Sequence, residues 1–130
     1  MSGVAGVTGV TGVTGVSGTP ATSDMAPFDV CGPLPQGTTL LEASAGTGKT
    51  FTIGALAARY VAEGVATLDE MLVITFGRAA SQELRERVRA QLVEAERAFA
   101  DPQSADPEST LLQHLLDVDE AERSRRRRRL

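Results

Sequence analysis

Four residues in the stretch EASAGTGKT, residues 42–50, have the chemistry to hold a phosphate group. Gly46 and Gly48 lack a Cβ atom, so the backbone N–H groups of this turn can point at one anion. Lys49 offers a positive charge to the β- and γ-phosphates of a nucleotide, and Thr50 offers a hydroxyl ligand to Mg²⁺. This spacing predicts a turn that binds ATP and Mg²⁺, with Lys49 and Thr50 as the catalytic residues.

The turn departs from the common G-x-x-x-x-G-K-[ST] pattern at one position, where Ala43 replaces the first glycine. Alanine costs little there if the backbone keeps a negative φ. The simpler alternative is a glycine-rich corner without a ligand. A β-prone run before the turn and a helical run after it favour the nucleotide site. The residues expected to contact the nucleotide are Ala43, Ser44, Ala45, Gly46, Thr47, Gly48, Lys49 and Thr50.

The elements that must position this turn follow from the hydrophobic pattern. Strands are predicted at 38–43 and 71–76, and helices at 49–64, 78–100 and, less strongly marked, 111–130. The run MLVITF at 71–76 is continuously apolar, which is typical of a buried parallel strand. The order of strand, phosphate turn, helix, strand and helix predicts an α/β fold with parallel strands and flanking helices.

The first 24 residues differ in composition from the rest. They hold six of the 13 glycines, spaced every third residue in a VTGVTGVTGV tract, and we expect a disordered tail at 1–24. Met25 is then a second candidate for the initiator. No stretch has the composition of a signal peptide or a membrane span, and Cys31 has no second cysteine to pair with, so we expect a cytoplasmic protein without membrane contact.

Two blocks together resemble a known family. EASAGTGKTFTI followed by LVITFGRAASQELRERVR is similar to the start of the UvrD/RecB group of superfamily 1 DNA helicases, most of all to its RecB-type members. That group commonly has alanine at the position of Ala43. The resemblance covers residues 28–99 and implies that 25–130 is a partial, truncated RecA-like P-loop NTPase domain.

The resemblance also implies a function. The expected activity is ATP-dependent DNA unwinding and translocation, as the N-terminal part of a helicase–nuclease (exonuclease V) subunit in the recombinational repair of double-strand breaks. Single- or double-stranded DNA and RecC- and RecD-like subunits are the implied partners. The DNA-contacting block would be Thr75, Phe76, Gly77 and Arg78, although Gly77 replaces a frequent threonine. Gln36 stands where the family contacts adenine. For Phe76 the alternative is core packing.

The remaining sequence lacks parts that such an enzyme needs. A second acid must hold Mg²⁺ and orient water, and the only candidates are Asp119 and Glu120, in a run that fits an amphipathic helix better than a strand. Six of the 13 basic residues lie in the last eight positions, as a DNA-binding tail or as a basic linker cut short. Two alternative functions therefore stay open: a non-catalytic nucleotide-binding fragment and an unrelated P-loop kinase.

Overall fold

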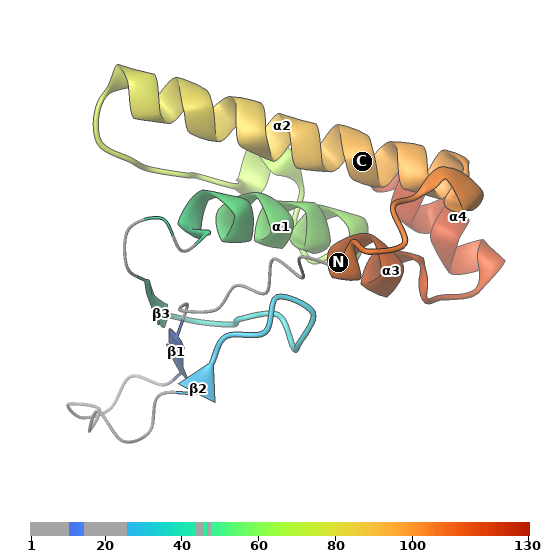
Figure 1. Ribbon diagram of the computed structural model, residues 1–130, viewed down its shortest axis with the longest axis horizontal. Coiled ribbons are helices and arrows are strands. Elements are labelled where there is room, and N and C mark those ends of the chain that lie inside the picture. Colours follow the sequence, from blue (N-terminus) through green and yellow to red (C-terminus); the bar gives the residue numbers. More distant parts are fainter. Residues whose placement is uncertain (1–10, 15–25, 44–45, 47) are drawn as a thin grey trace.

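The computed structural model describes residues 11–14, 26–43, 46 and 48–130. Helices dominate this part of the chain (Figure 1). They are α1 (Lys49–Ala62), α2 (Arg78–Ala100), α3 (Thr110–Leu116) and α4 (Glu120–Arg129), with 3-10 turns η2 (Leu68–Glu70) and η3 (Pro102–Ser104). The strands are β1 (Thr11–Thr14), β2 (Ala26–Pro27) and β3 (Thr39–Glu42). The predictions of a strand before the phosphate turn and of the helices beginning at 49 and 78 are confirmed.

Helices α1 and α2 lie side by side and run in the same direction (Figure 1). Their close contact depends on Gly54, which is buried in the second turn of α1. A Cβ atom at Gly54 would lie 3.1 Å from Cγ of Gln91 and 3.6 Å from the carbonyl oxygen of Arg87. The absence of a side chain at Gly54 therefore lets α2 approach the start of α1.

The hydrophobic core lies toward the C-terminal ends of α1 and α2. Leu111 and Leu115 of α3 are 2% and 1% exposed and are the largest fully buried side chains. They pack with Phe99 of α2 and with Ala55 and Ala62 of α1. Burying one leucine side chain contributes about 1.5–3 kcal/mol, so α3 is a principal source of stability.

The described strands form an antiparallel sheet in the order β2-β1-β3, in which Thr11 pairs with Glu42 and Thr14 with Thr39. The prediction of a parallel sheet is wrong for the described residues. Residues 71–76 form no strand, and Leu72, Ile74 and Phe76 are 84%, 80% and 97% exposed. A parallel strand needs neighbouring strands and covered faces, and β3 pairs with β1 instead.

Residues 11–14, within the stretch 1–24 expected to be a disordered tail, form β1, whose backbone pairs with β3; the other residues of 1–24 lie outside the described part, and the tail stays a prediction. One expectation about the helices needs correction. The helix predicted at 111–130 is two helices. Asp119 breaks it, because its carboxylate accepts a hydrogen bond from the backbone N–H of Glu122 at 2.7 Å and caps α4.

Candidate nucleotide-phosphate site

The phosphate turn joins the end of β3 to the start of α1 (Figure 1). Gly46 and Gly48 adopt φ angles of 77° and 90°. L-residues with side chains avoid this region, so both positions require the conformational freedom of glycine. The sequence prediction that these two glycines shape the turn agrees with the backbone.

The start of α1 offers hydrogen-bond donors to an anion. Gly48 is the N-cap and has no side chain to accept from the first N–H groups of the helix, and no acidic residue stands in the first turn. The helix begins with the backbone bond from Thr52 N–H to the Gly48 carbonyl, at 2.9 Å. Unpartnered N–H groups and the positive end of the helix dipole both favour a phosphate at this position.

A cavity of about 420 Å³ opens at this helix start. Its lining from the turn and α1 is Gly46, Gly48, Lys49, Thr50 and Phe51, and its lining from α2 is Glu83, Arg87, Ala90 and Gln91. Lys49 is exposed and Thr50 is half-buried. The structure therefore brings the predicted lysine and threonine to one cavity, and α2 forms its other wall.

The other residues predicted to contact the nucleotide do not line this cavity or lie outside the described part of the chain. Ala43 is half-buried just after β3, and Ser44, Ala45 and Thr47 lie outside the described residues. Gln36 is exposed and does not line the cavity at the phosphate turn. The loop before Gln36 is held by α1, since the Tyr60 hydroxyl donates a hydrogen bond to the Pro35 carbonyl.

The predicted DNA-contacting residues lie apart from that cavity. Phe76 is 97% exposed, so core packing does not account for it in this structure. Gly77 and Arg78 line a separate hollow of about 560 Å³ at the start of α2. Thr75 is half-buried and lines an apolar groove of about 830 Å³ along α2.

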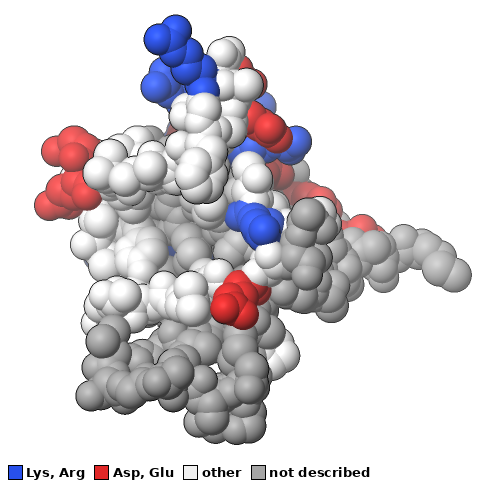
Figure 2. Space-filling model, turned by 90° about the vertical axis from the view of Figure 1, so that its left-hand side faces the viewer, with Lys and Arg blue, Asp and Glu red and all other residues white. Residues whose placement is uncertain are grey.

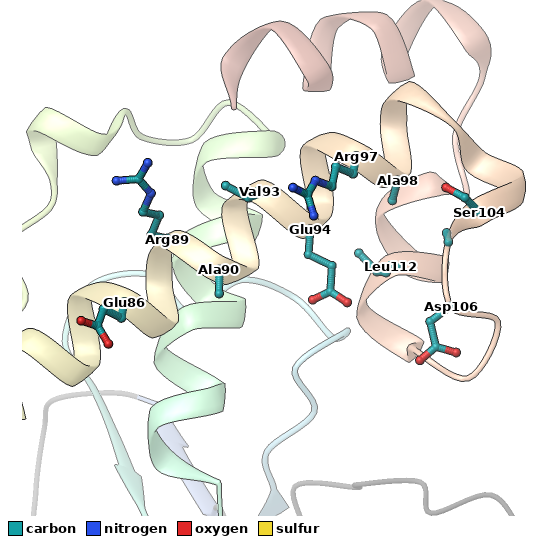
Figure 3. A pocket seen from close by; sticks show the side chains of 11 residues that line it. Glu86, Arg89, Ala90, Val93, Glu94, Arg97, Ala98, Ser104, Asp106 and Leu112 are labelled. Carbon is teal, nitrogen blue, oxygen red and sulfur yellow. The ribbon is translucent and has the colours of Figure 1, made fainter.

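Charge is dispersed on the face where α1 and α2 begin. Figure 2 shows single basic and acidic side chains among uncharged surface on that face, rather than one continuous basic patch. A further cavity of about 690 Å³ lies farther along α2. Figure 3 shows that its lining joins α2 to Ser104, Asp106 and Leu112, and none of the predicted site residues belongs to it.

The donor set fits a nucleotide phosphate: a glycine turn, an uncapped helix start, an exposed lysine and a threonine hydroxyl meet at one hollow. Fewer ligands are available for Mg²⁺. Thr50 supplies one oxygen atom, and the Asp119 carboxylate already accepts a hydrogen bond as the cap of α4. The carboxylate that shares the cavity with Thr50 is Glu83.

Comparison with models of known protein families identifies the family of this chain. The model of the UvrD/REP helicase N-terminal domain matches residues 29–121, which is most of the chain. The chain belongs to this family. Membership gives it the P-loop NTPase type of helicase fold, which the sequence resemblance had predicted.

Similar proteins are RecB subunits of RecBCD enzymes. The chain is 60% identical to that of Mycolicibacterium smegmatis over 106 residues, 80% of this chain and 10% of that protein. It is 58% identical to that of Mycobacterium tuberculosis H37Rv over 105 residues, 79% and 9% of the two chains. Against that of Escherichia coli K12 it is 51% identical over 67 residues, 45% and 6%. The chain thus spans about a tenth of the length of the first two relatives. No solved structure matches it significantly.

Two smaller expectations concern cysteine and membranes. Cys31 is half-buried beside the Thr110 carbonyl, 3.5 Å from its Sγ atom, and burial raises the pKa of its thiol, so the reactive thiolate is disfavoured. Among the described residues, no helix combines the length and the apolar character that crossing a bilayer requires.

Proposed function

We propose that this chain binds ATP with Mg²⁺ at the phosphate turn and serves as the N-terminal part of a RecB-like DNA helicase subunit in recombinational repair. The observation that carries the proposal is the cavity at the start of α1, where Lys49 and Thr50 meet the glycine turn of a UvrD-family domain. Lys49 would neutralise charge on the β- and γ-phosphates, and Thr50 would contribute its hydroxyl to Mg²⁺. Hydrolysis at this site supplies the free energy for moving along DNA.

The proposed DNA contacts are Thr75, Phe76, Gly77 and Arg78. Phe76 presents its ring to solvent, where a base can stack on it for about 1–3 kcal/mol, and Arg78 opens α2 with an exposed guanidinium. Gln36 is the proposed adenine contact. In the complete protein we expect RecC- and RecD-like partner subunits and an exonuclease activity, in line with the names of the relatives, and a cytoplasmic location.

A second function is favoured by one observation. Asp119, one of the two acids considered as a second Mg²⁺ ligand, is used to cap α4. The chain by itself would then bind the nucleotide without turning it over. The unrelated kinase is not proposed, because the family match covers both the phosphate turn and the block at 75–87.

The test is to titrate the 130-residue chain with Mg·ATP by calorimetry, and to compare it with the variant Lys49→Ala. We expect Lys49→Ala to weaken binding by roughly 10- to 100-fold, the loss of one charge-assisted contact. Unchanged affinity in Lys49→Ala would overturn the proposed site. Circular dichroism of both proteins checks that the exposed substitution leaves the fold intact.

Turnover is measured on the same two proteins, and DNA contact on two further variants. Phosphate release with and without single-stranded DNA distinguishes an ATPase from a binding fragment. Phe76→Ala should lower DNA affinity but leave ATP affinity unchanged, and Ile74→Ala, another exposed apolar residue, is its matched control. Equal DNA binding by these two variants would argue against the DNA contact at Phe76.

A further inference from the structure

The cavity at the phosphate turn has a second wall, which α2 provides. Glu83, Arg87 and Gln91 follow one another at intervals of four residues, so they lie along one face of the helix, and all three line the cavity. The packing at Gly54 fixes the distance of this wall, because the Arg87 carbonyl and the Gln91 side chain stand directly over that glycine.

Arg87 is the second cation of the cavity besides Lys49. It is exposed, and in the described part of the chain no ion pair joins it to a carboxylate. The guanidinium is charged at every physiological pH and carries donors in a planar fork that matches phosphate oxygens. A nucleoside triphosphate carries several negative charges, and Lys49 alone neutralises one of them.

We propose that Arg87 is a further phosphate-binding residue of the nucleotide site, contacting the nucleotide from α2 while Lys49 contacts it from α1. The inference rests on the proposed function. Glu83 shares the wall, so its carboxylate opposes an anion that carries no metal ion. The two charged side chains of the α2 wall therefore act on phosphate with opposite sign.

The test measures affinity of the full 130-residue chain for ATP and for adenosine, which has no phosphate. Arg87→Ala should weaken ATP binding by roughly five- to tenfold, with Arg87→Lys intermediate, because the loss is that of a solvent-screened charged contact. The matched control is Arg89→Ala, which removes the same charge from the same helix but from a position outside this cavity. Arg89→Ala should change ATP affinity less than twofold, roughly the effect of a screened distant charge.

Two companion measurements make the result specific. Adenosine binding should be equal in all variants, and Glu83→Gln should strengthen ATP binding measured with EDTA. An equal effect of Arg87→Ala and Arg89→Ala on ATP would overturn the inference, as would an equal loss of adenosine binding. If Lys49→Ala weakens ATP binding while Arg87→Ala does not, only this inference fails. If Lys49→Ala has no effect, the proposed site itself fails.

Discussion

Arg59 is the residue on which the packing of the N-terminal loop depends. It is 3% exposed, and its guanidinium donates to the carbonyl oxygens of Val30 at 2.7 Å and Gly32 at 2.5 Å. Its Nε atom donates to Glu63 at 2.7 Å. A buried charge is tolerated only where such partners satisfy it, and here they tie the loop at 30–32 to the end of α1. The loop leads directly to Gln36, so Arg59 also holds the region proposed to meet adenine.

Replacing Arg59 by leucine should lower the free energy of unfolding by about 2–4 kcal/mol, since it leaves two carbonyl groups and Glu63 without their donor. Urea unfolding followed by circular dichroism measures this loss. The exposed Arg89→Leu is the control and should change stability by less than about 0.5 kcal/mol. A loss in Arg59→Leu no larger than in the control would show that the loop is not held by this side chain.

At the scale of elements, α4 fastens the ends of two other helices. Arg126 donates to the Leu115 carbonyl at 3.0 Å and Arg123 to the Leu116 carbonyl at 2.9 Å, both at the C-terminus of α3. Arg129 donates to the Ala62 carbonyl at the end of α1, at 2.9 Å. Carbonyls in the last helical turn lack partners within their own helix, and cations are favoured there. The arginine run that looked like a tail or a linker therefore makes contacts within the domain.

Glu122 organises these arginines and makes α4 sensitive to acid. Its carboxylate accepts hydrogen bonds from Arg125 at 2.6 Å and from Arg126 at 3.3 Å. The bond from Arg125 is the main cause that lowers the pKa of Glu122, and the bond from Arg126 adds to it. A carboxylate whose pKa is lowered by folding stabilises the folded state above its unfolded pKa, and this contribution is lost as the pH falls through the folded value.

We therefore expect Glu122→Gln to be less stable than the unmodified chain at neutral pH, with the difference shrinking as the solution becomes acidic. Urea unfolding over a series of pH values measures it. Glu94→Gln, an exposed carboxylate of α2, is the matched control and should show a smaller difference at neutral pH. A gap between Glu122→Gln and the unmodified chain that stays constant down to acid would contradict the lowered pKa.

For the whole molecule, the main feature is an apolar segment that the fold leaves uncovered. Residues 71–76 pass beside α2, where Leu84, Val88 and Leu92 line the apolar groove, yet Leu72 and Ile74 point largely into solvent. The hydrophobic core instead lies around α3, toward the C-terminal ends of α1 and α2. Exposed apolar surface of this kind favours association between molecules.

Replacing both Leu72 and Ile74 by threonine should change the free energy of unfolding by less than about 0.5 kcal/mol, because neither side chain is buried. The same replacement should reduce self-association in sedimentation velocity, since it removes apolar surface from solvent contact. By contrast, Leu115→Ala should cost about 2–5 kcal/mol through the cavity it leaves. A destabilisation of the double variant as large as that of Leu115→Ala would mean that the segment packs against the domain.

Much of the site could be predicted because its determinants are local. Gly46 and Gly48 are needed for the backbone angles of the turn. The helical spacing of apolar residues after Lys49 and after Arg78 predicts α1 and α2 without knowledge of their tertiary contacts. The α2 wall was missed, because which face of α2 meets the turn depends on the close packing at Gly54. Only the spacing of residues 83, 87 and 91 hinted at it.

The sequence by itself therefore determined the phosphate turn, the helices that begin at 49 and 78, and the kinship with UvrD-type helicases. The tertiary structure decided where β3 pairs, that residues 71–76 stay outside any described strand, and that arginines of α4 bind the ends of α1 and α3. The physical reason is range. Turn angles and helical periodicity are fixed by neighbours in the chain, whereas the pairing of β3 with β1 and the bond from Arg129 to the end of α1 depend on partners distant in sequence.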